Sequence, residues 1–150
     1  MTDASTGPAS PEFRLLVRAL PEDIDELRHV SNLVYLRWVI DVALAHSAAV
    51  GWTRPAYLAA GHVFVVRRHE IEYLASALEG DEIELVTWID SWTAATSVRR
   101  TQLLRTRDGK VLATASTTWA LVATDSGRPK RIPAAMMDDF RQRVARADDV

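Results

Sequence analysis

The segment that most constrains the fold is residues 33–50, which is apolar around most of its circumference. Its apolar residues recur at helical spacing in one stripe, made of Leu33, Leu36, Ile40, Leu44 and Ala48. Ser31 and Asn32 before it are good N-cap residues, and Gly51 suits the position after a helix C-terminus. A helix of this length would be about 27 Å long. We expect it to be buried on most sides, so that the rest of the chain wraps around it.

The remaining pattern is mostly that of β-strands. We predict strands over Glu12–Leu20, His62–Leu74, Glu82–Trp92, Thr93–Thr106 and Val111–Leu121. Gly80-Asp81 and Asp108-Gly109 mark turns between them. Two further helices are expected, a short one at Thr53–Ala60 and a C-terminal one over Pro133–Ala147. No strand–helix–strand repeat occurs, which favours an α+β fold with an antiparallel sheet around one helix.

Composition limits the class of protein. The chain has 150 residues, 48% of them hydrophobic, which suits one domain, expected over residues 12–147 behind a mobile tail at residues 1–11. A net charge of −2 argues against a nucleic-acid surface. The absence of cysteine excludes disulfides, thiolate zinc sites and a cysteine nucleophile, and it fits the predicted cytoplasmic location. No uninterrupted apolar run is long enough to predict a membrane span.

One motif carries a family resemblance: Asp23-x-Asp25-x-x-x-His29-Val30-x-Asn32-x-x-Tyr35-Leu36-Arg37-Trp38. It resembles the signature of hotdog-fold thioesterases, in the 4-hydroxybenzoyl-CoA thioesterase/YbgC-like branch. Weaker matches are Glu70-Ile71-Glu72-Tyr73, the Gly80-Asp81 turn with Trp88 beyond it, and Gly127-Arg128-Pro129. The resemblance implies a five-stranded sheet wrapped on the central helix and a homodimer or dimer of dimers with active sites between protomers. It also implies an acyl-CoA or acyl-ACP substrate and no cofactor.

The sequence departs from the family pattern at two positions of the loop. Arg28 and Ser31 stand where the family usually has Gly and Asn. An arginine adopts a positive φ angle less readily than a glycine, so the turn at residue 28 is the place where the loop has most reason to differ.

The residues of the motif suit thioester hydrolysis. The reaction needs a carboxylate that attacks the carbonyl or activates water, and donors for the oxyanion. The first amides of a helix have no internal partners, so the N–H of Asn32, or that of Leu33, is a candidate donor. In the resembled family, the residue matching Asp25 is the nucleophile or general base, and the amide matching Asn32 is the oxyanion donor. His29 either assists that chemistry or packs as a hydrogen-bonded side chain, and Asp23 is expected to be structural.

Substrate-binding candidates lie elsewhere in the chain. Tyr35 belongs to the motif, and Arg67-Arg68 and Arg99-Arg100 are candidates for the phosphates of coenzyme A, with surface arginines as the plainer interpretation. Glu70 and Glu72 share one strand face and are either alternative carboxylates or a solvated face. The histidines show no metal-ligand spacing with carboxylates, so no metal is predicted. A non-catalytic acyl-thioester-binding protein is the alternative function, whereas a hotdog dehydratase is disfavoured because its His-Phe-Pro motif is missing.

Overall fold

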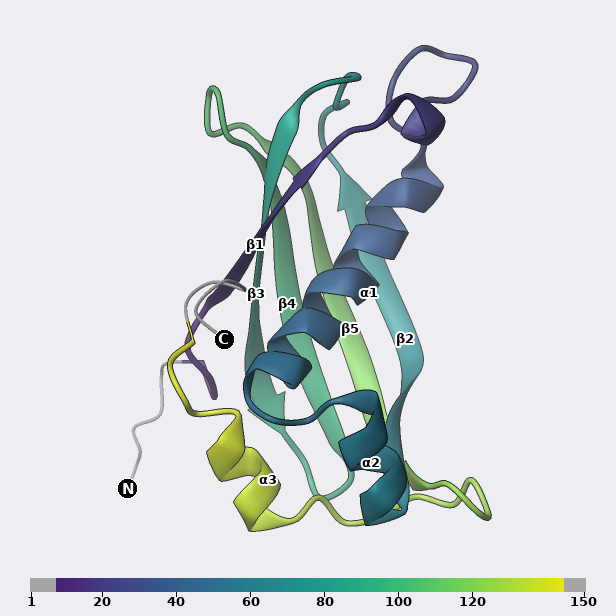
Figure 1. The fold of residues 1–150 in the computed structure, drawn as a ribbon, viewed down its shortest axis with the longest axis vertical. Helices are drawn as coiled ribbons and strands as arrows, with labels where there is room; N and C mark the ends of the chain where they lie inside the picture. Colours follow the sequence, from purple (N-terminus) through teal and green to yellow (C-terminus); the bar gives the residue numbers. More distant parts are fainter. Residues whose placement is uncertain (1–7, 145–150) are drawn as a thin grey trace.

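A computed structural model describes residues 8–144, and its main feature is a single antiparallel sheet behind one long helix (Figure 1). The strands are β1 (Phe13–Arg18), β2 (His62–Tyr73), β3 (Glu82–Trp92), β4 (Thr96–Arg105) and β5 (Val111–Ala123). The sheet order is β1-β3-β4-β5-β2, and every neighbouring pair is antiparallel. The helices are α1 (Asn32–Ala49), α2 (Arg54–Ala60) and α3 (Ala134–Asp139), with a 3-10 helix η1 (Pro21–Asp23). The predicted hotdog architecture is confirmed.

The long helix α1 crosses one face of the sheet from end to end (Figure 1). Its N-terminus lies beside the loop of residues 21–31, and its C-terminus lies near α2 and α3. Val34, Trp38, Val39 and Val42 face inward from the helix and join a core that includes Leu85 of β3 and Leu103 of β4. The two ends of α1 are therefore separate places in the molecule, about 27 Å apart.

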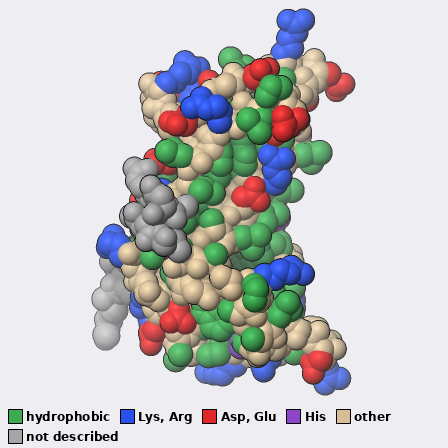
Figure 2. All heavy atoms as spheres, in the orientation of Figure 1, with side chains coloured by type: hydrophobic (Ala, Val, Ile, Leu, Met, Phe, Trp, Pro, Cys, Tyr) green, Lys and Arg blue, Asp and Glu red, His purple; other side chains and the backbone are tan. Residues whose placement is uncertain are grey.

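The prediction that α1 is buried on most sides is wrong for the single chain. The stripe picked out by its spacing faces outward: Leu33 is 70% exposed and Leu44 is 54% exposed, whereas the inward face is made of Val34, Tyr35, Trp38, Val39, Val42, Ala43, His46 and Ser47. Figure 2 shows hydrophobic side chains along the outer side of this helix. Both faces carry apolar residues, so hydrophobic spacing alone did not distinguish the face that packs on the sheet.

The C-terminal helix is shorter than predicted. It runs over Ala134–Asp139 rather than over Pro133–Ala147, and residues 140–144 are not helical. Met136 and Phe140 are buried, while Arg141, Gln142 and Arg143 that follow have no apolar face. Val144 packs against both hydrophobic clusters from beyond the helix, so apolar contact with the core continues without helical structure. Residues 145–147 of the prediction, and residues 1–7 of the predicted tail, lie outside the described residues.

No single helix within residues 8–144 combines the length and the apolar composition of a membrane span, and only α1 and α2 taken together, with a bend of 68° between them, reach that threshold.

Candidate active site

The loop before α1 closes on itself in a tight, hydrogen-bonded structure. Ile24 and Val30 form an antiparallel bridge, and the amide of Asp25 donates to the carbonyl of His29 at 3.0 Å. The turn between them is made by Arg28, which has a φ angle of +69°. Arg28 thus adopts the left-handed conformation for which the resembled family usually has glycine, at a cost of about 1–2 kcal/mol for a residue with a side chain.

Asp23 anchors this loop to α1. Its carboxylate accepts hydrogen bonds from the amide of Leu20 at 2.9 Å and from Arg37 of α1 at 3.1 Å, and its carbonyl accepts one from the amide of Ser31 at 3.0 Å. The residue is only 3% exposed. A buried carboxylate is tolerated where its oxygens are satisfied in this way. Asp23 therefore supports the loop, as the sequence suggested.

Asp25 lies half-buried on the same loop, next to His29. One carboxylate oxygen, Oδ1, accepts a hydrogen bond from the amide of Leu27 at 2.9 Å and lies 3.8 Å from Nδ1 of His29. The other oxygen, Oδ2, has no hydrogen-bond partner among residues 8–144. The Nδ1 atom of His29 is buried and also lacks a hydrogen-bond partner there. The loop thus holds a carboxylate and an imidazole close together, each with capacity left for a further contact.

The first turn of α1 leaves one amide uncommitted. Ser31 is the N-cap, and its hydroxyl accepts a hydrogen bond from the amide of Leu33 at 3.2 Å. The amide of Val34 donates to the Ser31 carbonyl at 3.0 Å. Of the two amides proposed as oxyanion donors, that of Leu33 is therefore occupied, whereas that of Asn32 has no acceptor within the helix. The hydroxyl of Tyr73, at the end of β2, reaches the carbonyl of Asn32 at 3.4 Å.

Tyr35 holds the loop between β2 and β3 in place rather than facing an open site. Its hydroxyl donates to the carbonyl of Ala75 at 2.9 Å and accepts from the amide of Ala77 at 2.8 Å, and burial raises its pKa. The carbonyl of Ala77 in turn accepts from the amide of Val30 at 2.8 Å. Because both hydrogen-bonding sides of the hydroxyl are used, that hydroxyl is not free for a substrate. The ring still stacks on Tyr73 and Trp38, so a substrate-binding role for Tyr35 stays a prediction.

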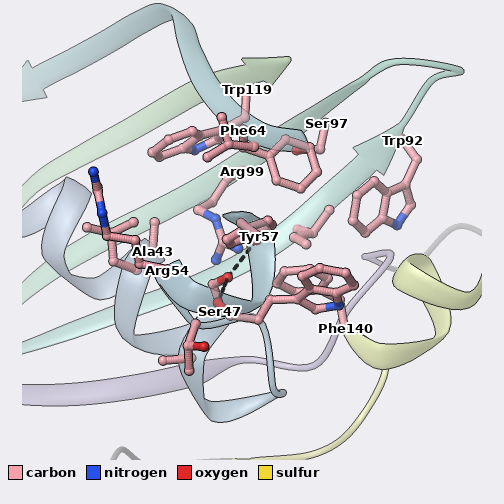
Figure 3. Close-up of a pocket in the computed structure, with 16 residues that line it drawn as sticks. Ala43, Ser47, Arg54, Tyr57, Phe64, Trp92, Ser97, Arg99, Trp119 and Phe140 are labelled. Carbon is pink, nitrogen blue, oxygen red and sulfur yellow. Dashed lines mark hydrogen bonds between the residues drawn. The ribbon is translucent and has the colours of Figure 1, made fainter. Parts of the chain in front are cut away.

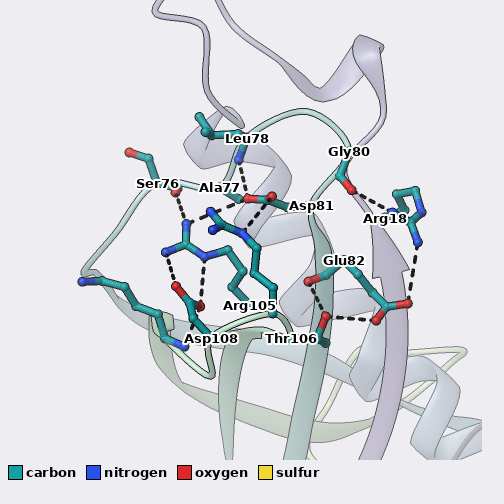
Figure 4. Close-up of polar contacts among 12 residues, drawn as sticks. Arg18, Ser76, Ala77, Leu78, Gly80, Asp81, Glu82, Arg105, Thr106 and Asp108 are labelled. Carbon is teal, nitrogen blue, oxygen red and sulfur yellow. Dashed lines mark hydrogen bonds and ion pairs between the residues drawn. The ribbon is translucent and has the colours of Figure 1, made fainter.

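Hydrogen bonds and ion pairs at the end of the sheet hold the same loop between β2 and β3 in place (Figure 4). Arg105 makes two hydrogen bonds to Asp108, at 2.9 and 3.1 Å, and one to the carbonyl of Ser76 at 3.3 Å. The Arg105 hydrogen bonds, followed by one from the amide of Lys110, lower the pKa of Asp108 to about 2. Asp81 caps the turn by accepting from the amide of Leu78 at 2.9 Å. The loop between β2 and β3, which contacts Val30 beside the candidate site, is therefore held in place at Ser76 and at Leu78.

The other predicted substrate-binding residues lie away from Asp25 in the chain. Arg68 and Glu70 form an exposed ion pair at 3.0 Å on β2, at the edge of the sheet. Glu70 and Glu72 share a face, as predicted, and line a shallow hollow there with Arg100 and Gln102. Arg67 is exposed at an irregularity in the β2 register. The structure does not bring Arg67, Arg68 or Glu70 together with Asp25, and their roles stay predictions.

The sequence analysis missed a cavity at the opposite end of α1 (Figure 3). It has a volume of about 350 Å³, and Arg99 is among its lining residues. The interpretation of Arg99 as a surface arginine was wrong: it is 5% exposed, whereas Arg100 points outward and pairs with Asp90 at 3.5 Å. A role of Arg99 in phosphate binding stays a prediction. The signal was present, because Ser97, Arg99, Thr101 and Leu103 alternate along β4 and all four are buried.

Neither of these two cavities includes Asp25, His29 or Asn32. Across residues 8–144, no group of three or more histidine, aspartate or glutamate side chains is arranged to hold a metal ion. The absence of a metal or cofactor therefore remains a prediction.

Comparisons with known proteins agree with this fold. The sequence profile of the thioesterase-like superfamily matches residues 19–140. A 1,4-dihydroxy-2-naphthoyl-CoA thioesterase from Synechocystis has a similar structure, with a TM-score of 0.80, 14% identity, and coverage of 87% of this chain and 96% of that one. A DHNA-CoA thioesterase from Staphylococcus aureus gives a TM-score of 0.74 at 18% identity, covering 80% of each chain.

A third similar structure is a variant of 4-hydroxybenzoyl-CoA thioesterase, with an asparagine in place of an aspartate, in complex with 4-hydroxybenzoyl-CoA. Its TM-score is 0.78 at 19% identity, with coverage of 86% of this chain and 98% of that one. A search of curated protein sequences gives no significant match. The predicted family resemblance, and with it the enzyme class of thioester hydrolases, is confirmed at the level of the family.

Proposed function

Since the chain belongs to the thioesterase-like superfamily, we propose that it hydrolyses acyl-CoA thioesters at the loop–helix junction of Asp25 and Asn32. Asp25 acts as nucleophile or general base, and the amide of Asn32 stabilises the oxyanion. The observation that carries this proposal is the pair of uncommitted groups at one end of α1. These are Oδ2 of Asp25 and the amide of Asn32, the first of the helix. The next amide, that of Leu33, is occupied because it donates to the hydroxyl of the N-cap Ser31.

The chemistry follows from these two groups. In the general-base route, Oδ2 of Asp25 takes a proton from water, and the resulting hydroxide attacks the thioester carbon. In the nucleophilic route, Oδ2 itself attacks, and water later hydrolyses the mixed anhydride. In both routes negative charge develops on the former carbonyl oxygen, where an amide at a helix N-terminus is a favourable donor. The thiolate of the carrier leaves and takes up a proton.

The site is completed by a second copy of the chain. Asp25 is half-buried, Asn32 is exposed, and neither of the two cavities described above contains them, which supports this. A partner surface would supply the wall that excludes water. The homodimer, the cytoplasmic location and the choice between CoA and ACP as carrier belong to this proposal.

The experiment is a thiol-release assay with aryl, short-chain and long-chain acyl-CoA substrates. The Asp25→Asn variant should lose about 10²–10⁴-fold in rate, while Asp41→Asn, an exposed acid on α1, serves as the matched control. A rate that survives in folded Asp25→Asn would remove Asp25 from the mechanism. One turnover in ¹⁸O-labelled water tests the nucleophilic route in which water attacks the Asp25 carbonyl of the anhydride: the product acid then carries an unlabelled oxygen from the enzyme and Asp25 gains the label, whereas the general-base route puts the label in the product acid and leaves Asp25 unlabelled.

A second candidate function rests on one observation. Oδ1 of Asp25 is held by the amide of Leu27, as would be expected of a loop that only needs the aspartate for its shape. A non-catalytic acyl-thioester-binding protein would bind acyl-CoA and release no thiol above background. Isothermal titration of the wild-type protein with an acyl-CoA, run beside the thiol-release assay, distinguishes binding without turnover from catalysis.

A further inference from the structure

Arg99 is a buried cation with no carboxylate to pair with. It projects from β4 and is 5% exposed. Within residues 8–144, no Asp or Glu lies within ion-pair distance of it. Asp139 contacts a lining residue of the cavity beside Arg99, since it accepts a hydrogen bond from the indole of Trp52 at 2.9 Å. Burying an isolated charge is costly, so a lone buried guanidinium calls for an explanation.

Only one edge of the Arg99 guanidinium is used inside the protein. Its Nη1 lies 2.9 Å from Nδ1 of His46 and donates to Thr87 at 3.1 Å. Burial, followed by the charge of Arg99, lowers the pKa of His46 to about 3, so His46 is neutral and its Nδ1 accepts. Nε and Nη2 have no hydrogen-bond partner in the described chain. That free edge presents two parallel N–H groups, the geometry that binds a carboxylate in bidentate fashion.

The walls of the cavity around Arg99 are mostly aromatic and apolar, and Trp92 and Trp119 are among its lining residues. The hydroxyls of Ser47 and Tyr57 are already engaged, because Ser47 donates to the carbonyl of Trp52 at 2.7 Å and lies 2.6 Å from the Tyr57 hydroxyl. Figure 3 shows Arg99 among these aromatic side chains. The partner that this cavity lacks is therefore a negatively charged hydrogen-bond acceptor for Arg99.

The cavity also has an entrance and a useful size. Leu44, Ala48 and Arg54 line it and are exposed, so it reaches the surface between α1 and α2. Its volume of about 350 Å³ is at the small end of the range for small-molecule sites. Ala43, the first α1 residue of the lining, lies eleven residues beyond Asn32, roughly 16 Å along the helix. The cavity is thus distinct from the loop–helix junction.

We propose that this cavity binds the carboxylate of a small aliphatic or aromatic acid, which pairs with the free edge of Arg99 while the apolar body of the acid packs among the aromatic walls. A phosphate is a poorer match because its further oxygens would find mostly apolar surface. A neutral lipid would leave the guanidinium unpaired. The binding does not depend on the proposed hydrolysis, because none of its residues belongs to the loop–helix junction.

The binding experiment uses octanoate and 3-phenylpropionate, with octanol and 3-phenylpropanol as uncharged controls of similar shape. Three tryptophans, Trp52, Trp92 and Trp119, line the cavity, so their fluorescence reports occupancy directly. A ligand that binds only the folded state also raises the melting temperature with concentration. We expect each acid to bind at least tenfold more tightly than its alcohol and to raise the melting temperature, whereas equal binding of acid and alcohol would overturn the proposal.

Two variants locate the site and one serves as a matched control. Arg99→Gln should weaken octanoate binding tenfold or more, whereas Arg100→Gln, which changes the adjacent arginine on the outer face, should leave it unchanged. Ala43→Phe keeps Arg99 but fills the cavity and should also prevent binding, which covers the case in which Arg99→Gln does not fold. Equal weakening by the Arg99 and Arg100 variants, or unimpaired binding in folded Ala43→Phe, would show that the acid binds elsewhere.

Discussion

The two ends of α1 differ in how polar groups are placed against an apolar helix. At the N-terminal end, backbone hydrogen bonds of a short loop shape the site, and Asp25 and His29 remain partly exposed. At the C-terminal end, side chains enclose a cation, and Arg99 is almost fully buried. The catalytic candidates of the first end line neither of the two cavities described above, whereas the second end contains one of them. A site open in the single chain can be completed by a partner, while a closed one already selects its ligand.

The sharpest way to test that difference is to disable one end and measure the other. Asp25→Asn should lower thioester hydrolysis by about 10²–10⁴-fold, because it removes the carboxylate but keeps the shape of the side chain. The same variant should still bind octanoate as tightly as the wild-type protein, measured by tryptophan fluorescence. Loss of both properties in a variant that melts normally would show that the two ends act as one site.

Acidification should lower the free energy of unfolding through His46, which lies at the enclosed end of α1. Its pKa is lowered to about 3, first by burial and then by the charge of Arg99, against about 6.5 in the unfolded chain. Between these values the unfolded state binds a proton that the folded state does not. The contribution of His46 to the free energy of unfolding is therefore fully present above pH 6.5. It falls on acidification, by about 2 kcal/mol at pH 5. Urea unfolding at pH 7 and at pH 5 measures it.

His46→Phe provides the comparison for that measurement. It keeps a ring that packs between Phe13 and Phe140, whose centroids lie 5.1 and 5.6 Å from that of His46. The variant should lose less stability than the wild-type protein between pH 7 and pH 5, whatever its stability at pH 7. The same loss in both proteins would mean that another group accounts for the acid sensitivity.

At the open end, the largest effect on stability should come from Asp23. Asp23→Ala removes the acceptor for the amide of Leu20 and for Arg37, and hydrogen bonds to a charged group contribute about 1.5–3 kcal/mol each at most. We expect a loss of about 2–3 kcal/mol in urea unfolding. Asp41→Ala is the matched control: Asp41 lies 3.9 Å from the same arginine but on the surface, so its loss should stay within about 0.5 kcal/mol. Equal losses would contradict the anchoring role of Asp23.

The open end was also the more predictable of the two. Capping by Ser31 and the loop between residues 21 and 31 are local features that depend on neighbouring residues. The enclosed end depends on contacts between β4, α1, α2 and α3 that are distant in sequence. Alternation along β4 indicated that Arg99 shares a face with Leu103, but a charged residue is so often exposed that this signal was outweighed.

Two other differences have the same origin. The outward stripe of α1 was as regular as the inward face, so spacing identified the helix but not the side that packs on the sheet. The C-terminal helix ends at Asp139 although Val144 beyond it still packs against the core, so the apolar pattern did not locate the end of the helix. Sequence patterns predicted the elements and their order, whereas burial had to come from the structure.

The smallest expected effect concerns the turn at Arg28. Its φ angle of +69° costs about 1–2 kcal/mol with a side chain present, and Arg28→Gly removes that strain while adding about 0.5–1 kcal/mol of chain entropy to the unfolded state. We expect a net gain of up to about 1 kcal/mol in urea unfolding. Glu26→Gly in the same exposed loop lacks the relief and should lose about 0.5–1 kcal/mol. If both glycine variants lose stability equally, the turn carries no strain at residue 28, and the arginine would fit the loop as well as the glycine of the family pattern.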